Sequence, residues 1–151
     1  MKELLVVFHT QSGATGRLAR AVFDGACAED ACLSRILPAF DAGVADLRRA
    51  DGVVFCTPEN FGYVSGGMKD FLDRTFYAVQ GEERGRAYAL VVSAGNDGTG
   101  AVRQMQRILR GYPMREIAEP LIVRGPPSAD ALSRAQEIGQ TIAVGLSMGI
   151  F

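Results

Sequence analysis

The chain alternates short, almost wholly apolar runs with longer segments whose apolar residues recur at helical spacing. Continuous apolar runs of four to eight residues are typical of parallel strands buried on both faces. Such runs predict strands over residues 3–8, 52–57 and 88–93, and less apolar segments predict two more over residues 32–37 and 114–123. The amphipathic segments between them predict helices over residues 12–28, 44–50, 68–79, 101–110 and 128–146.

Strands that alternate with helices indicate an α/β fold, in which helices cover both faces of a parallel sheet. We expect one domain over residues 1–151, a doubly wound five-stranded sheet of order 2-1-3-4-5. Pro120 cannot donate to a central ladder, so the fifth strand belongs at an edge. Ligands of such sheets bind beyond the carboxyl ends of the strands, which selects the loops at 9–16, 57–66 and 93–100.

Composition narrows the class of partner. The chain is 48% apolar and 22% charged, with a formal net charge of −1. That balance predicts neither a nucleic-acid partner nor an anionic membrane surface. No apolar run reaches transmembrane length. The three cysteines, Cys27, Cys32 and Cys56, lack zinc spacing, so we expect no metal site and reduced thiols in a cytoplasmic protein.

The loop after the first strand reads HTQSGATG, residues 9–16, and consists largely of small and hydroxyl-bearing residues. Successive N–H groups and a helix N-terminus meet there, which predicts an anion site. No lysine completes a Walker A motif, and Gly13 and Gly16 alone do not make a GxGxxG turn. An uncharged loop of this kind suits a terminal phosphate. The alternative is a tight turn in which Ser12 caps the helix.

The second loop carries a more specific motif. TPENFGYVSGGMKDFLD, residues 57–73, resembles the segment TPE-x2-G-x3-G-x2-K-x3-D of NAD(P)H-dependent FMN reductases. HTQSGATGRLA is similar to the T-x-S-G-x-T phosphate loop of flavodoxin-family oxidoreductases. Asn60-Phe61 stands where the reductases usually have Tyr-Asn, and Tyr63-Val64-Ser65 where they have Ser-Ile-Pro. The resemblance implies a flavodoxin-like fold that binds FMN.

The resemblance, together with the position of the three loops, implies which residues hold the flavin. The first loop would bind the phosphate, and the other two would face the isoalloxazine edge, with a donor near N1 and O2 from the third. The expected cofactor-binding residues are Thr10, Gln11, Ser12, Gly13, Ala14, Thr15, Pro58, Glu59, Asn60, Phe61, Gly62, Ala94, Gly95, Asn96, Asp97 and Gly98. Hydride passes between nicotinamide and flavin without a side-chain acid or base, so no catalytic residue is expected.

Two functions fit these features. In the first, an enzyme takes electrons from NADPH or NADH through FMN to flavin, quinone or another small acceptor. In the second, a flavodoxin-type carrier moves electrons between protein partners. Such carriers are strongly acidic around the flavin, whereas only Glu59 and Asp97 lie in these loops, which favours the enzyme. The reductases that the chain resembles further imply a homodimer or higher homo-oligomer.

Several other residues invite interpretation. Phe61 and Tyr63 either cover the flavin or pack their loop onto the body. His9 is expected to be structural, Lys69 and Asp73 a surface pair, and Cys56 a packing residue. Phe76 and Tyr77 are adjacent on a helix and cannot both face one core. Three arginines share a helix face that is either solvated or meets the NADPH 2′-phosphate or another subunit: Arg103, Arg107 and Arg110.

Overall fold

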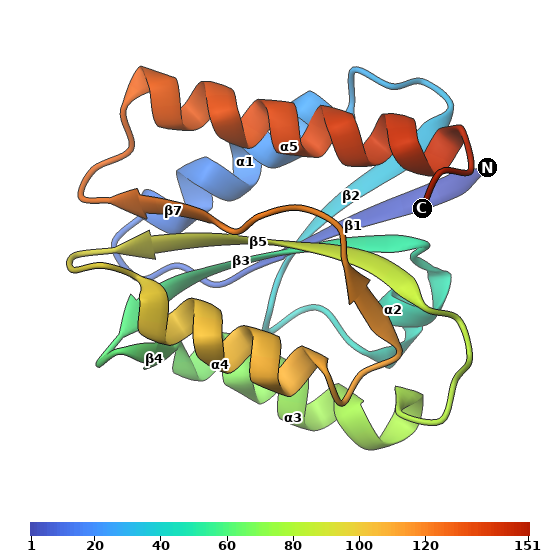
Figure 1. Cartoon of the computed structure of the whole chain (residues 1–151), viewed down its shortest axis with the longest axis horizontal. Coiled ribbons are helices and arrows are strands. Elements are labelled where there is room, and N and C mark those ends of the chain that lie inside the picture. Colours follow the sequence, from blue (N-terminus) through green and yellow to red (C-terminus); the bar gives the residue numbers. More distant parts are fainter.

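The computed structural model describes the whole chain, Met1 to Phe151, as a parallel sheet between two layers of helices (Figure 1). The strands are β1 (Lys2–Phe8), β2 (Cys32–Pro38), β3 (Gly52–Asn60), β4 (Tyr63–Val64), β5 (Arg86–Ala94), β6 (Met114–Glu116) and β7 (Leu121–Arg124). The helices are α1 (Ala14–Ala26), α2 (Val44–Arg49), α3 (Gly66–Val79), α4 (Thr99–Leu109) and α5 (Ala129–Ser147).

The strands run in the order β2-β1-β3-β5-β6, which confirms the doubly wound sheet. The single fifth strand predicted over residues 114–123 is wrong. It is divided into β6 and β7, which both pair with β5. Pro120 lies in the interruption between them, where no ladder hydrogen bond is lost. The small β4 is a second difference, since it pairs antiparallel with the end of β3 inside the expected loop at 57–66.

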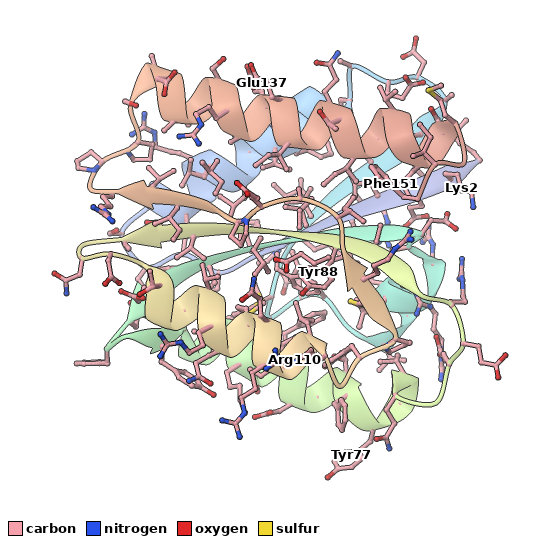
Figure 2. All side chains as sticks on the ribbon, viewed as in Figure 1. Lys2, Tyr77, Tyr88, Arg110, Glu137 and Phe151 are labelled. Carbon is pink, nitrogen blue, oxygen red and sulfur yellow. The ribbon has the colours of Figure 1, made fainter.

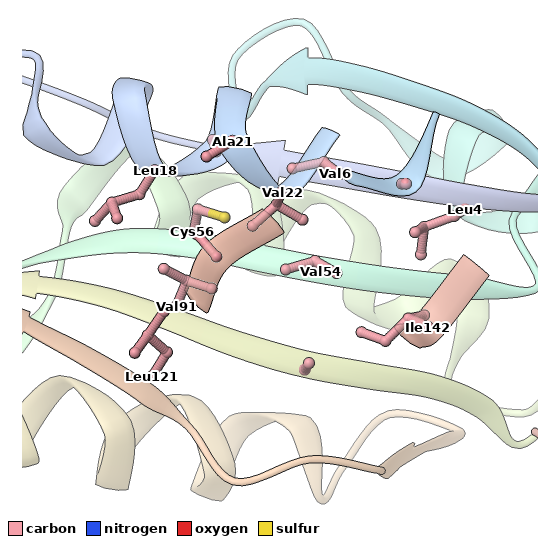
Figure 3. Packing of buried hydrophobic residues seen from close by; sticks show 14 of the residues in the cluster. Leu4, Val6, Leu18, Ala21, Val22, Val54, Cys56, Val91, Leu121 and Ile142 are labelled. Carbon is pink, nitrogen blue, oxygen red and sulfur yellow. The ribbon is translucent and has the colours of Figure 1, made fainter. Parts of the chain in front are cut away.

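Two hydrophobic cores hold the layers together. One lies between the sheet and the helices α1 and α5; Figure 3 shows Leu18 and Val22 of α1 facing Val54, Cys56 and Val91 of the sheet. Cys56 is completely buried there, and burial raises the pKa of its thiol, as expected of a packing residue. The second core lies between the sheet and α2, α3 and α4.

Helices α1 and α5 approach so closely that their backbones touch. A Cβ on Gly139 would lie 1.9 Å from the Val22 carbonyl oxygen, and one on Gly25 would lie 2.0 Å from that of Gln136. Only glycine fits at these two crossings. The contact with α5 fixes the position of α1, and therefore also the position of the loop that leads into α1.

Helix boundaries follow their caps. Ser128 caps α5 as expected, since its Oγ accepts from the Ala131 N–H at 3.1 Å.

Lys69 and Asp73 form the expected surface pair on α3, with Nζ and Oδ1 2.7 Å apart. No helix combines the length and apolar character that crossing a bilayer requires.

Candidate flavin site

The three predicted loops meet at the carboxyl end of the sheet, at the left in Figure 1. The first and third loops line a cavity of about 450 Å³. Its remaining wall comes from the turn between β7 and α5, which the sequence interpretation did not include. The lining residues are Ser12, Gly13, Ala14, Arg17, Ser93, Ala94, Gly95, Gly125, Pro126 and Pro127.

The first loop presents free backbone donors to this cavity. The N–H groups of Ala14, Thr15 and Gly16 begin α1 and donate to no acceptor within the protein. Ser12 does not cap the helix, because Gly13 occupies the cap position with φ +103° and no side chain accepts from the first turn. The Gly13 N–H instead donates to Thr10 Oγ1 at 3.1 Å, which folds the loop over itself. The interpretation of Ser12 as a helix cap is therefore wrong.

Three polar side chains near these N–H groups have no hydrogen-bond or ion-pair partner within the protein. Thr15 is 2% exposed and Ser93 9% exposed, yet neither hydroxyl is hydrogen-bonded within the protein. Arg17, the residue directly after the loop, lines the cavity and forms no ion pair. Neither hydroxyl oxygen is sealed from solvent, because the buried side-chain atoms without a partner lie elsewhere in the protein. Both hydroxyls are therefore free to bond to a ligand, and with the free N–H groups they suit the oxygens of a phosphate and ribityl chain. Sequence reasoning missed Ser93, the first residue of the third loop, and Arg17, which directly follows the first loop.

The second loop is a hairpin rather than an open loop. Glu59 pairs with Val64 and Asn60 with Tyr63, and the turn between them places Phe61 at φ +53° and Gly62 at φ +68°. Two positive φ values give the mirror-image turn that suits the twist of a hairpin. A bulky residue rarely adopts this conformation, and Phe61 is also fully exposed. Packing of Phe61 onto the body is thereby ruled out in this structure.

The second and third loops are joined to each other and to the first. Glu59 Oε2 accepts from the Ala101 N–H at 3.0 Å, so its side chain caps α4. The Asn60 amide donates to Gln11 Oε1 at 2.7 Å. In the third loop, the N–H and hydroxyl of Thr99 donate to Asp97 and hold the pKa of that carboxyl below its usual value. Contact of Pro58–Gly62 and Ala94–Gly98 with flavin remains a prediction.

His9 makes contacts that connect the first loop to neighbouring elements. Its Nδ1 lies 2.8 Å from Ser65 Oγ, and Ser65 also bonds to Thr57 and caps α3. Its ring meets Phe40 edge-on, with centroids 5.6 Å apart. Burial lowers the pKa of His9, which favours the neutral ring. These contacts agree with a structural residue that ties the end of β1 to the start of α3.

The protonation of His9 makes stability depend on pH. Because its pKa is lower in the folded protein, the unfolded chain takes up the proton first as pH falls. The contribution of His9 to the free energy of unfolding should thus be constant above about pH 6.5, and the free energy of unfolding should fall progressively below that pH. Urea unfolding between pH 7 and pH 5.5 measures this slope. The His9→Gln variant should be flatter over that range, and an unchanged slope would assign the effect to another group.

Sequence comparison links the site to known flavoproteins. The profile of the family described as "NADPH-dependent FMN reductase" matches residues 11–125, which include most of the first loop and all of the other two. A flavodoxin of Aquifex aeolicus (strain VF5) is 32% identical over 100 residues, 66% of this chain and 54% of that protein. The match thus spans about half the length of this relative.

Solved structures show the same fold. A flavodoxin from the domain Archaea superimposes with a TM-score of 0.82 at 20% identity, over 95% of this chain and 98% of that one. The rubredoxin oxygen:oxidoreductase of Desulfovibrio gigas gives 0.86 at 15% identity, over 99% of this chain and 37% of that one. The fold is flavodoxin-like, and the family match covers most of the sequence. The chain belongs to the NADPH-dependent FMN reductase family.

Proposed function

We propose that this protein binds FMN and passes electrons from NADPH or NADH through it to a small acceptor such as free flavin or a quinone. The cradle of unpaired N–H and hydroxyl groups at Ser12–Gly16 and Ser93 carries the proposal. A phosphate monoester needs several such donors, and charge-assisted hydrogen bonds to it are the strong ones. The family match supports the same cofactor.

Bound FMN supplies the hydride and electron chemistry, and the chain supplies position and electrostatics. The phosphate would lie on the first turn of α1. The ring edge would lie between Pro58–Gly62 and Ala94–Gly98, which the Glu59–Ala101 bond holds together. Fixing these two loops in advance limits the ordering cost of binding. No protein acid or base is required.

Arg17 should add a long-range attraction for the phosphate. Its guanidinium is exposed and unpaired, so the contribution is that of a surface ion pair, at most about 1 kcal/mol. Arg17→Ala should weaken FMN about fivefold, chiefly at low salt. Fluorescence titration at two ionic strengths measures this, with Arg20→Ala on the same helix as the control. Equal losses in both variants would mean a general charge effect.

Steady-state oxidation of NADPH and NADH tests the enzymatic function. FMN, a quinone and an azo dye serve as competing acceptors with the FMN-loaded protein. The proposal expects turnover with at least one acceptor. A second function, that of an electron carrier, is favoured by the likeness to the Aquifex flavodoxin. If no acceptor turns over while a separate reductase reduces the bound flavin, the carrier function replaces the enzyme.

A homodimer is also proposed, on the evidence of a large aromatic side chain that is exposed. Phe76 packs against Tyr112, with ring centroids 5.4 Å apart, whereas Tyr77 is 82% exposed. Figure 2 shows Tyr77 pointing away from the body of the protein. Exposed aromatics of this kind are enriched at interfaces. Light scattering at assay concentration tests the proposal, and a mass near 16 kDa would contradict it.

A further inference from the structure

The ion pairs of this protein are distributed unevenly along the chain. Every lysine and arginine within residues 1–86 forms an ion pair except Arg17. None of the six arginines within residues 103–134 does. Three of these six lie on α4 or at its C-terminal cap, and the sequence from Gly98 to Arg115 contains no acidic residue.

The α4 arginines form one continuous row. Arg103, Arg107 and Arg110 are exposed, while Ala101, Met105 and Leu109 on the opposite side of the helix are buried. Seven residues of helix span about 10 Å, so the row is much longer than a single phosphate group. Figure 2 shows Arg110 at the far end of α4, on the same side of the sheet as Tyr77. We call these three residues the α4 basic row.

The near end of the row reaches the proposed flavin site. The first turn of α4 contacts the second loop, because Ala101 donates to Glu59 and Gly100 packs on the Gly62 carbonyl. Arg103 follows one turn later, and the charges of Arg124 and Arg103 contribute to the lowered pKa of Asp97 in the third loop. The exposed ring of Phe61 lies on the adjacent hairpin. A partner on the row would thus sit beside the flavin loops.

The surroundings favour a protein over a small anion. Arg103 and Arg107 are both exposed, so this part of the row is an open surface. Arg110 borders a cavity of about 370 Å³, but the Glu116 carboxylate lines the same cavity and opposes a free phosphate. Arginine and an exposed aromatic are the residue types enriched at protein interfaces.

We infer that the α4 basic row docks an acidic electron-transfer protein beside the flavin. The inference rests on the proposed flavin site and adds an acidic protein to the small acceptors proposed above. Complementary charge chiefly speeds and orients such an encounter. Binding should therefore be strong at low salt and weaken steeply as salt is added.

Binding of two redox proteins of opposite charge tests the inference. A plant-type ferredoxin serves as the acidic probe and cytochrome c as the basic one, each titrated by fluorescence anisotropy at about 20 and 200 mM salt. Ferredoxin should bind more tightly than cytochrome c at low salt. The Arg103→Glu/Arg107→Glu variant should lose about tenfold or more in ferredoxin affinity.

The control is Arg20→Glu/Arg134→Glu, which changes the net charge equally but lies on α1 and α5, across the sheet. It should retain most of the ferredoxin affinity. Equal losses in both variants, or no ferredoxin binding at low salt, would overturn the inference. So would a loss confined to NADPH affinity, which assigns the row to the nucleotide, or a loss confined to self-association, which assigns it to a second copy. Ferredoxin is also titrated with the flavin-free protein. This second titration distinguishes failure of the docking surface from failure of the proposed flavin site.

Discussion

Removing one hydroxyl from the phosphate loop should weaken FMN binding by about ten- to a hundredfold. Ser12 lines the cavity, and the hydroxyl of Thr15 makes no hydrogen bond within the protein. A hydrogen bond to a charged group contributes about 1.5–3 kcal/mol, and 1.4 kcal/mol is a factor of ten. Titration of the Ser12→Ala and Thr15→Val variants with FMN measures the loss.

Riboflavin and the melting temperature provide the controls for these variants. Riboflavin lacks the phosphate, so its affinity should barely change. Ser12 does not cap α1 and makes no hydrogen bond within the protein, so Ser12→Ala should leave the melting temperature unchanged. Equal losses for FMN and riboflavin would show that these hydroxyls only shape the turn.

Gly100→Ala should disrupt the backbone contact between Gly100 and Gly62, which packs the third loop against the second. An added Cβ would lie 2.0 Å from the Gly62 carbonyl oxygen, and backbone on both sides leaves little room to relax. We expect a destabilisation of about 1–3 kcal/mol or more and at least tenfold weaker FMN binding. Alanine is the better helix former by about 1 kcal/mol, so any loss comes from the clash rather than from helix propensity.

The matched variant is Gly66→Ala, which also replaces a glycine in the first turn of a helix. No atom lies within 4 Å of a Cβ at Gly66. It should therefore be neutral or slightly stabilising and should bind FMN normally. Thermal unfolding and FMN titration of both variants make the comparison. If Gly100→Ala behaves like Gly66→Ala, the two loops do not depend on this contact.

The sequence was sufficient to predict the layers and the location of the site. Its apolar runs mark buried parallel strands, and the rule for carboxyl ends then selects three loops, two of which line the cavity. It was not sufficient to predict where strands end. The division of the last strand follows Pro120, and the continuation of β3 into a hairpin depends on Phe61 and Gly62 adopting positive φ. Neither local conformation is specified by hydrophobic periodicity.

Contacts between distant segments account for the other omissions. Arg17 reaches the cavity because α1 turns it there, and Ser93 because β5 ends beside the first loop. The Glu59 carboxylate caps α4, a contact that the sequence interpretation did not include. Gly100 and Gly62 are far apart in sequence and meet only through the fold. Such approaches follow from the packing of elements, which a single sequence does not display.

Titration of the flavin-free protein with FMN and with riboflavin tests the central claim most directly. Quenching of flavin fluorescence at micromolar protein reports the affinity and the stoichiometry. We expect one FMN to bind per chain. Riboflavin should bind at least tenfold more weakly, because it lacks the phosphate that the free N–H groups of α1 would bind. FMN fluorescence that stays unchanged, or riboflavin bound as tightly as FMN, would contradict a phosphate cradle at Ser12–Gly16.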